Sequence, residues 1–231
     1  MYSSGSSPML INCDFVSNSA IEGGGLYITS ESEPTLTDCR FIGNSAADAG
    51  GALRLYDRCA PILTSCTFTG NSSLDGIGAG GGVAMRVDCD PSFASCEFSG
   101  NLSVDGGGML VDLGCDPDIQ QCLFVGNSVS KRGGGLLIIN QCNPRLTACD
   151  ITGNTADIAG GWVWVTSASL MLDSCGIVNN SAIEGGALYI NNDPASLSSS
   201  TVCGNTSDQI VGNYTDLGGN CITEVCEDSD G

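Results

Sequence analysis

The residues that could do chemistry in this sequence are carboxylates and cysteines, and histidine is absent altogether. Without histidine, Cys–His catalysis is excluded, and the commonest general base and metal-binding imidazole are missing. A group of carboxylates between residues 88 and 118 offers the oxygen ligands that Ca²⁺ prefers. Calcium is therefore a candidate ligand, but a solvated acidic edge is the favoured interpretation. The group consists of Asp88, Asp90, Asp112, Asp116 and Asp118.

Fourteen cysteines indicate an oxidising compartment, because cytosolic proteins seldom contain so many. None of them has the C-x-x-C spacing of a zinc ribbon or a thioredoxin-type site. Four lie two residues before a proline, and we expect the bridges Cys59–Cys89 and Cys115–Cys142, with Cys89–Cys115 as a competing pairing. A further pairing near the C-terminus would clamp the end of the fold. The candidates for disulfide bonds are Cys59, Cys89, Cys115, Cys142, Cys203, Cys221 and Cys226.

These residues lie on a repeat of about 26 residues, which must position them. One element of the repeat has the form Cys-x-apolar-x-x-Asn, and a second has two or three glycines followed by alternating apolar residues. The first element begins at Cys13, Cys39, Cys66, Cys96, Cys122, Cys149 and Cys175. The second spans residues 23–28, 50–55, 80–85, 106–111, 133–138, 160–165 and 185–190.

Each unit contains short strands of period two that are joined by glycine and asparagine turns. Adjacent glycines in the middle of every unit argue against a helical repeat, and the Leu/Asn spacing of leucine-rich repeats is absent. The sequence therefore predicts an all-β fold, a right-handed parallel β-helix (β-solenoid) of about eight coils. We expect the β-helix to span residues 1–219, with a C-terminal cap or tail over 220–231 that leads to a linker or a further module.

The repeat resembles that of the chlamydial-type polymorphic outer membrane proteins, which is defined by GGA-[ILV] and FxxN elements. The resemblance covers roughly residues 8–219, although the C-terminal translocator barrel of that family is missing. It implies a right-handed β-helix that is exposed on a cell surface or secreted, and in some members adhesive. The matching segments here are FxxN at 15–18, 41–44, 68–71, 98–101 and 124–127, and GGAL at 50–53 and 185–188.

An apolar stripe is predicted on the outer face of the strands that follow the glycines. A stripe of this size on a rod is typical of a contact surface. Its occupant could be another subunit, a glycan or a covering loop of the same chain, and the sequence favours another subunit. The stripe consists of Leu110, Leu137, Ile139, Trp162, Trp164 and Tyr189.

Two further expectations concern the first coil and glycosylation. Pro8 and Cys13 already belong to a repeat, so we expect an open strand edge at the first coil. Either the chain is a fragment, or another subunit covers this edge. Sequons at Asn213 and Asn179 lie in favourable positions for glycosylation if the protein is secreted.

The formal net charge of -19 opposes binding to nucleic acid, and no apolar run is long enough for direct membrane insertion. Acidic residues recur as columns along the repeat, without convergence at one place. We therefore expect a non-enzymatic extracellular structural or adhesive protein, without a cofactor, that self-associates through its open coil end and its apolar stripe. The alternative is a carbohydrate-binding or polysaccharide-lyase-like β-helix protein, with a glycan as its ligand.

Overall fold

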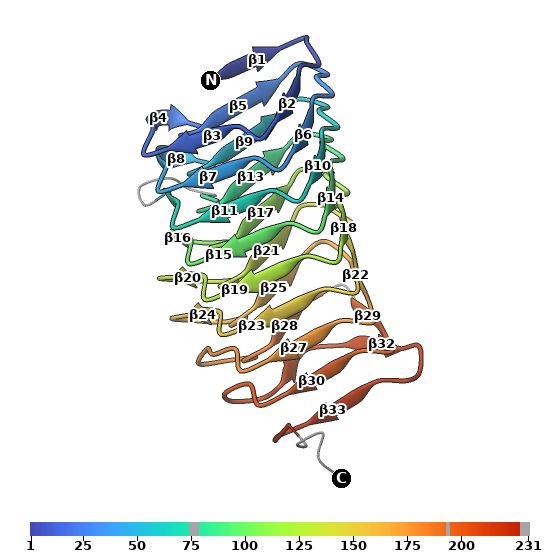
Figure 1. Ribbon diagram of the computed structural model, residues 1–231. Coiled ribbons are helices and arrows are strands. Elements are labelled where there is room, and N and C mark those ends of the chain that lie inside the picture. The colour runs from blue at the N-terminus through green and yellow to red at the C-terminus, as the bar shows by residue number, and fades with distance from the viewer. Residues whose placement is uncertain (74–78, 193–194, 227–231) are drawn as a thin grey trace.

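The chain forms a rod of stacked coils in which every sheet is parallel (Figure 1). The computed structural model describes residues 1–73, 79–192 and 195–226, and these contain strands and turns but no helix. Each coil contributes one strand to each of three nine-stranded sheets, which we call A, B and C. Most of the coils also add a strand to a six-stranded sheet D.

The strands of the four sheets follow one another in the order B, C, D and A along the chain. Sheet A contains β1 (Tyr2–Ser4), β5 (Leu26–Thr29), β9 (Leu53–Tyr56), β13 (Val83–Arg86), β17 (Met109–Asp112), β21 (Leu136–Ile139), β25 (Val163–Thr166), β28 (Leu188–Asn191) and β31 (Ile210–Val211). Sheet B contains β2 (Met9–Ile11), β6 (Thr35–Thr37), β10 (Ile62–Thr64), β14 (Ser92–Ala94), β18 (Asp118–Gln120), β22 (Arg145–Thr147), β26 (Leu170–Asp173), β29 (Ala195–Ser198) and β32 (Tyr214–Asp216). Sheet C contains β3 (Asp14–Val16), β7 (Arg40–Ile42), β11 (Thr67–Thr69), β15 (Glu97–Ser99), β19 (Leu123–Val125), β23 (Asp150–Thr152), β27 (Gly176–Val178), β30 (Thr201–Cys203) and β33 (Cys221–Thr223). Sheet D contains β4 (Ser19–Glu22), β8 (Ser45–Ala49), β12 (Ser72–Ser73), β16 (Leu102–Ser103), β20 (Ser128–Val129) and β24 (Thr155–Ala156).

The register places like residues over like residues, as the repeat predicts. Phe41 lies opposite Phe68, and Phe68 lies opposite Phe98. Their rings stack at centroid separations of 4.8 and 4.9 Å, close to the spacing of neighbouring strands. The predicted parallel β-solenoid is therefore confirmed, and its core is a set of axial columns.

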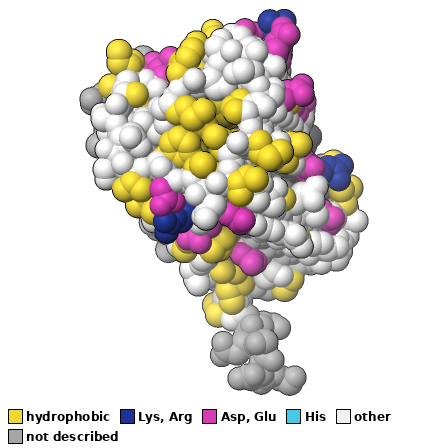
Figure 2. All heavy atoms as spheres, turned by 45° about the horizontal axis from the view of Figure 1, so that its top comes forward, with side chains coloured by type: hydrophobic (Ala, Val, Ile, Leu, Met, Phe, Trp, Pro, Cys, Tyr) yellow, Lys and Arg dark blue, Asp and Glu magenta, His cyan; other side chains and the backbone are white. Residues whose placement is uncertain are grey.

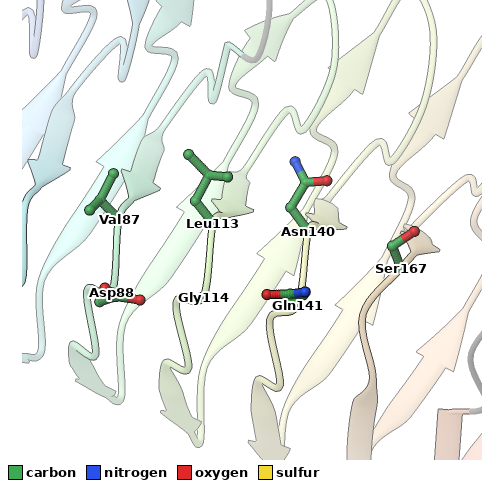
Figure 3. A pocket seen from close by; sticks show the side chains of 7 residues that line it. All are labelled: Val87, Asp88, Leu113, Gly114, Asn140, Gln141 and Ser167. Carbon is green, nitrogen blue, oxygen red and sulfur yellow. The ribbon is translucent and has the colours of Figure 1, made fainter.

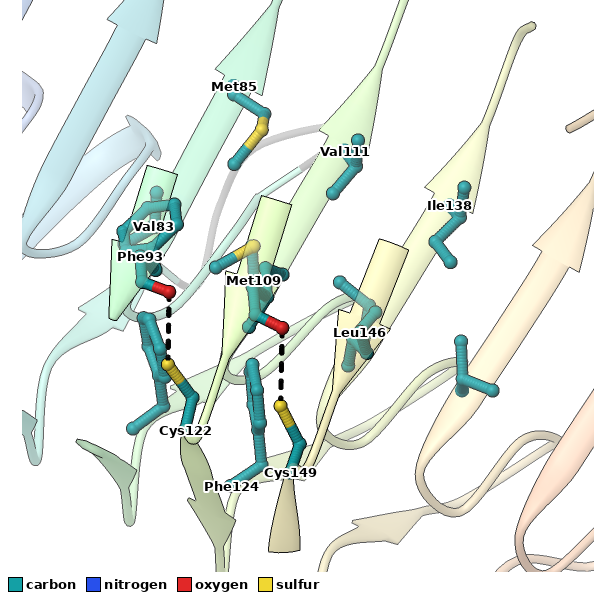
Figure 4. Packing of buried hydrophobic residues seen from close by; sticks show 14 of the residues in the cluster. Val83, Met85, Phe93, Met109, Val111, Cys122, Phe124, Ile138, Leu146 and Cys149 are labelled. Atoms are coloured by element: carbon teal, nitrogen blue, oxygen red, sulfur yellow. Dashed lines mark hydrogen bonds between the residues drawn. The ribbon is translucent and has the colours of Figure 1, made fainter. Parts of the chain in front are cut away.

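Buried thiols form two of these columns. Cys122 packs beside Phe124 and donates a hydrogen bond from Sγ to the carbonyl oxygen of Phe93 at 3.6 Å (Figure 4). Its own Sγ accepts the backbone N–H of Cys96 at 3.3 Å. A thiol thus fills space as a small apolar group and also satisfies a buried turn amide.

The asparagines at the turn between sheets C and D form a continuous ladder. The backbone N–H and the Nδ2 of Asn71 donate to Oδ1 of Asn101 at 2.9 and 3.0 Å, and the same Nδ2 donates to the carbonyl oxygen of Phe41 at 3.0 Å. At the C-terminal end, Oε1 of Gln209 accepts from Nδ2 of Asn205 at 2.7 Å. The ladder therefore ends within its own coil.

The double glycine is required by the close approach of neighbouring coils before sheet A. A Cβ added to Gly51 would lie 2.2 Å from the carbonyl oxygen of Gly81, which no side chain can tolerate.

At the C-terminus, β33 pairs with β30. Strand pairing therefore continues past the boundary predicted at residue 219, and residues 227–231 of the predicted tail lie outside the described residues.

Candidate functional surfaces

The predicted apolar stripe is only partly exposed. Leu110 and Leu137 point outward from sheet A, but both are buried in a small cluster with Ala49 and Ala84. The turn before sheet A contributes to this cover, because a Cβ on Gly106 would lie 3.3 Å from Cβ of Leu137. Part of the stripe is therefore covered by the chain itself.

Trp162 requires a correction, because its side chain lies in the main core and is fully buried. It occupies the third position of the glycine element, just before β25, where the bend directs the side chain inward. The added Cβ of Gly135 would lie 2.5 Å from Cδ1 of Trp162. In earlier coils a phenylalanine fills this space, since Cδ1 of Phe124 lies 3.1 Å from the added Cβ of Gly108. Trp162 therefore fills the volume that Ile151 leaves in the phenylalanine column.

The remaining members of the stripe are Ile139, Trp164 and Tyr189, and all three are half-buried. Trp164 lies between Leu137 and Tyr189 in the register of sheet A. The guanidinium of Arg132, from the preceding coil, lies 4.6 Å from the Trp164 ring centroid, and the Tyr189 ring stacks on it at 6.4 Å. Both faces of the indole are occupied, so mainly its edge is available for contact.

Arginines on sheet A and its flanking turns are used in ion pairs between coils. Nε of Arg86 lies 2.8 Å from Oδ2 of Asp112, and Nε of Arg132 lies 3.0 Å from Oδ1 of Asp105. Arg54 is 2% exposed, and its Nε lies 3.5 Å from Oε1 of Glu22. Burial lowers the pKa of the Arg54 guanidinium. These arginines connect neighbouring coils, and Arg54 is also buried away from any ligand.

The candidate calcium ligands separate into different hydrogen-bonding roles. Oδ1 of Asp90 accepts the backbone N–H of Asp116 at 2.9 Å, and Oδ1 of Asp116 accepts the backbone N–H of Asn143 at 2.5 Å. Asp112 is buried in its ion pair, while Oδ2 of Asp118 accepts from Gln120. Within the described ranges, no group of three or more His, Cys, Asp or Glu residues could hold a metal ion.

The cysteine pairing differs from the expected one. Cys59, Cys89, Cys115 and Cys142 are free, buried thiols rather than two disulfides. The backbone N–H of Cys59 donates to Sγ of Cys89 at 3.3 Å, and that of Cys89 donates to Sγ of Cys115 at 3.2 Å. The sulfurs of Cys89 and Cys115 thus accept a turn N–H of the preceding coil, which gives them a structural role without a covalent bond.

One disulfide is present at the C-terminal end, between Cys203 and Cys226. It belongs to the predicted trio, and it ties the last described residues to β30. Cys221 is the remaining member of the trio, and it is free and exposed. The two sequon asparagines, Asn179 and Asn213, are exposed as well.

An open groove of about 660 Å³ runs along the turns between sheets A and B (Figure 3). It crosses consecutive coils and was not recognised from the sequence, because its shape depends on which turn residues lack a side chain. Its lining consists of Val87, Asp88, Leu113, Gly114, Asn140, Gln141 and Ser167. Asp88 is the only one of the predicted calcium candidates that faces it.

Comparison with known proteins identifies the architecture and no closer relative. No helix among the described residues is long and apolar enough to cross a membrane. No curated protein matches the sequence. A family model described as "Right handed beta helix region" matches residues 2–182, which is most of the chain and agrees with the stacked parallel coils. The chain therefore belongs to the right-handed β-helix family.

Proposed function

We propose that this chain is a non-enzymatic extracellular structural or adhesive rod that acts through association of its outer surfaces. The observation that carries the proposal is the use of its polar side chains in axial ladders and ion pairs between coils. Asparagines, thiols and arginines each form a hydrogen bond or an ion pair with the neighbouring coil, as Asn71, Cys89 and Arg86 illustrate. Such groups are committed to stability and are poorly placed for acid–base work on a substrate.

Two apolar regions support self-association. On the sixth and seventh coils, Ile158 and Ile183 are 50% and 74% exposed, and the same coils carry the half-buried Trp164 and Tyr189. On the first coil, Met9 and other large apolar side chains are exposed, and hydrophobic side chains gather where this end is turned forward (Figure 2). Exposed apolar patches on a rod with few charged residues are typical of contact surfaces.

The likeness to polymorphic outer membrane protein repeats and the Cys203–Cys226 disulfide support a secreted or cell-surface location. A glycan-binding or lyase-like function has weaker support. Arg54 is too buried to serve as a base, and both faces of the Trp164 ring are occupied, although sugars usually need an open aromatic face. The groove is the remaining place where a glycan could bind.

The proposal is tested by sedimentation velocity over a range of protein and salt concentrations. We expect reversible association that strengthens with salt, because added ions screen the repulsion between chains of formal charge -19. The double variant Trp164→Ser/Ile183→Ser should weaken it, whereas Ile62→Ser, which removes an exposed apolar side chain from sheet B, should not. A monomer under all conditions, or saturable binding on a glycan array, would count against the proposal.

A further inference from the structure

The groove between sheets A and B has two rows of residues, and the first of them begins with an apolar pair. Val87 and Leu113 occupy neighbouring coils in the first row, which continues with Asn140 and Ser167 (Figure 3). Asp88, Gly114 and Gln141 form the second row on the same coils. The groove therefore places aliphatic surface directly beside a carboxylate.

Gly114 creates the hollow at the centre of the second row. Its φ of +75° is favourable for glycine, and a Cβ here would lie 2.5 Å from Oδ1 of Asp88. The carboxylate of Asp88 leans into the space that the missing side chain leaves. Any side chain at this position would close the hollow or displace Asp88.

Asp88 differs from the carboxylates around it, because among the described residues it accepts no hydrogen bond and pairs with no cation. The nearest cation in its row, Arg58, is directed to Glu31 and Asp57 at 3.0 and 3.1 Å. On the other side, Asp112 is held by Arg86. Asp88 is thus an exposed anion beside a hollow, with both oxygens available.

Asn140 supplies a second acceptor with a defined orientation. Its Nδ2 donates to Oδ1 of buried Asp112 at 2.7 Å, and Asp112 is itself fixed by Arg86. The amide nitrogen is therefore used, and Oδ1 of Asn140 is turned toward the side of Ser167, at the far end of the groove from Asp88 (Figure 3). An acidic and acceptor-rich groove with an apolar pair is complementary to a cation on an aliphatic stem.

We propose that this groove binds a lysine side chain of a partner protein. The aliphatic stem packs on Val87 and Leu113, and the ammonium donates to the carboxylate of Asp88. The formal charge of -19 steers a basic partner toward the rod, and the groove then adds a local preference for this side chain. This inference does not depend on self-association, since it concerns a different face and a different chemistry.

The test is a titration of the ¹⁵N-labelled chain with Nα-acetyl-lysine N-methylamide, followed by amide chemical shifts. The neutral control ligand is Nα-acetyl-norleucine N-methylamide, which has an aliphatic side chain without the ammonium. We expect saturable shifts confined to residues 87–88, 113–114 and 140–141, with the neutral ligand at least tenfold weaker, roughly the effect of one charge-assisted contact. Asp88→Asn should weaken lysine binding by about tenfold as well.

A matched control is Asp90→Asn, which removes the same charge from the other side of Cys89 and retains the Oδ1 that accepts from Asp116. It should leave binding at the groove unchanged. Gly114→Asn should abolish binding by filling the hollow, and asparagine tolerates the positive φ. Equal losses in the Asp88 and Asp90 variants, or shifts spread over all acidic turns, would overturn the proposal. So would saturation of the same amides by CaCl₂ with no response to the lysine ligand.

Discussion

The exchange of packing partners between Ile151 and Trp162 leads to a quantitative prediction. In the second and fifth coils, a phenylalanine ring lies against the third glycine of the preceding coil: Phe41 against Gly25, and Phe124 against Gly108. In the sixth coil the phenylalanine is replaced by Ile151, and Trp162 lies against Gly135 instead. Reverting both positions together should restore the packing of the earlier coils.

The two single changes should destabilise the fold for opposite reasons, one by leaving a cavity and the other by overpacking. Trp162→Gly removes a fully buried indole and leaves a cavity, which lowers the free energy of unfolding by about 3–5 kcal/mol. Ile151→Phe adds a ring where the indole already fills the space, and overpacking of this kind costs about 1–3 kcal/mol. In the double variant the new ring enters the space that the indole leaves. Its stability should lie within about 1 kcal/mol of the native chain, a coupling of about 3 kcal/mol or more.

Urea unfolding followed by far-UV circular dichroism and by the fluorescence of Trp164, which all variants retain, measures this cycle. The control pairs Trp162→Gly with Val202→Phe, which adds a ring to the same column two coils away. Those two changes should be additive to within about 0.5 kcal/mol. Additivity in the Ile151 cycle as well would refute the compensation that we infer.

Three further predictions follow from the ladders and thiols. Burial raises the pKa of the Cys142 thiol from 9.0 to about 12, so the protonated thiol stabilises the fold fully below pH 9, and this contribution is lost as pH rises toward 12. Between these pH values the free energy of unfolding, measured in reducing buffer, should fall by about 1.4 kcal/mol per pH unit for this thiol. Cys142→Ala should lessen the slope. Asn127→Ala leaves the buried N–H and Nδ2 of Asn101 without their acceptor, and should lower the free energy of unfolding by about 3 kcal/mol in a urea titration, more than Asn18→Ala at the exposed end of the ladder. A thiol reagent should label exposed Cys221 first and half-buried Cys13 more slowly, with mass spectrometry of Cys221→Ser as the check; rapid labelling of Cys96 would contradict its burial.

The fold was predictable because equivalent positions of a repeat have the same surroundings in every coil, so the residue type at each position is sampled several times. Phe41, Phe68 and Phe98 each lie two residues after a cysteine and three before an asparagine, so one interpretation applies to all of them. The same regularity explains why the columns of asparagine and cysteine could be recognised before the structure. Period-two patterns determine which face a side chain occupies, and stacking determines its neighbours.

The details of the surface were less predictable, because they depend on the turns, where the pattern of period two fails. Trp162 and Trp164 are two residues apart, which places both on one face of a strand, yet the glycine bend before Val163 turns Trp162 into the core. The pattern of period two predicts that Leu137 points outward, but a turn from the preceding coil covers its side chain. Whether an outward side chain is exposed depends on such contacts, which no single strand encodes.

The prediction of bridges among Cys59, Cys89, Cys115 and Cys142 was wrong for a related reason. Neighbouring coils bring cysteines close enough for a bridge, and spacing alone cannot distinguish a bond from a hydrogen bond between the same positions. In the column of Cys59 and Cys89, the sulfur accepts a turn N–H. In the equivalent place of the other thiol column, Oγ of Ser200 accepts the N–H of Cys175 at 3.1 Å. This position therefore requires an acceptor for the turn N–H, and either a thiol or a hydroxyl can supply it.

The same columns indicate where specific binding can arise on such a rod. A residue that repeats along the axis has its neighbours as partners, as the Asn71–Asn101 pair shows, and is then unavailable to a ligand. A residue becomes available where the column is interrupted, because its expected partner is missing. Gly114 interrupts a column between Asp88 and Gln141, and the groove lies at that interruption. The places where a stacked fold departs from its own repeat are therefore the first to test for function.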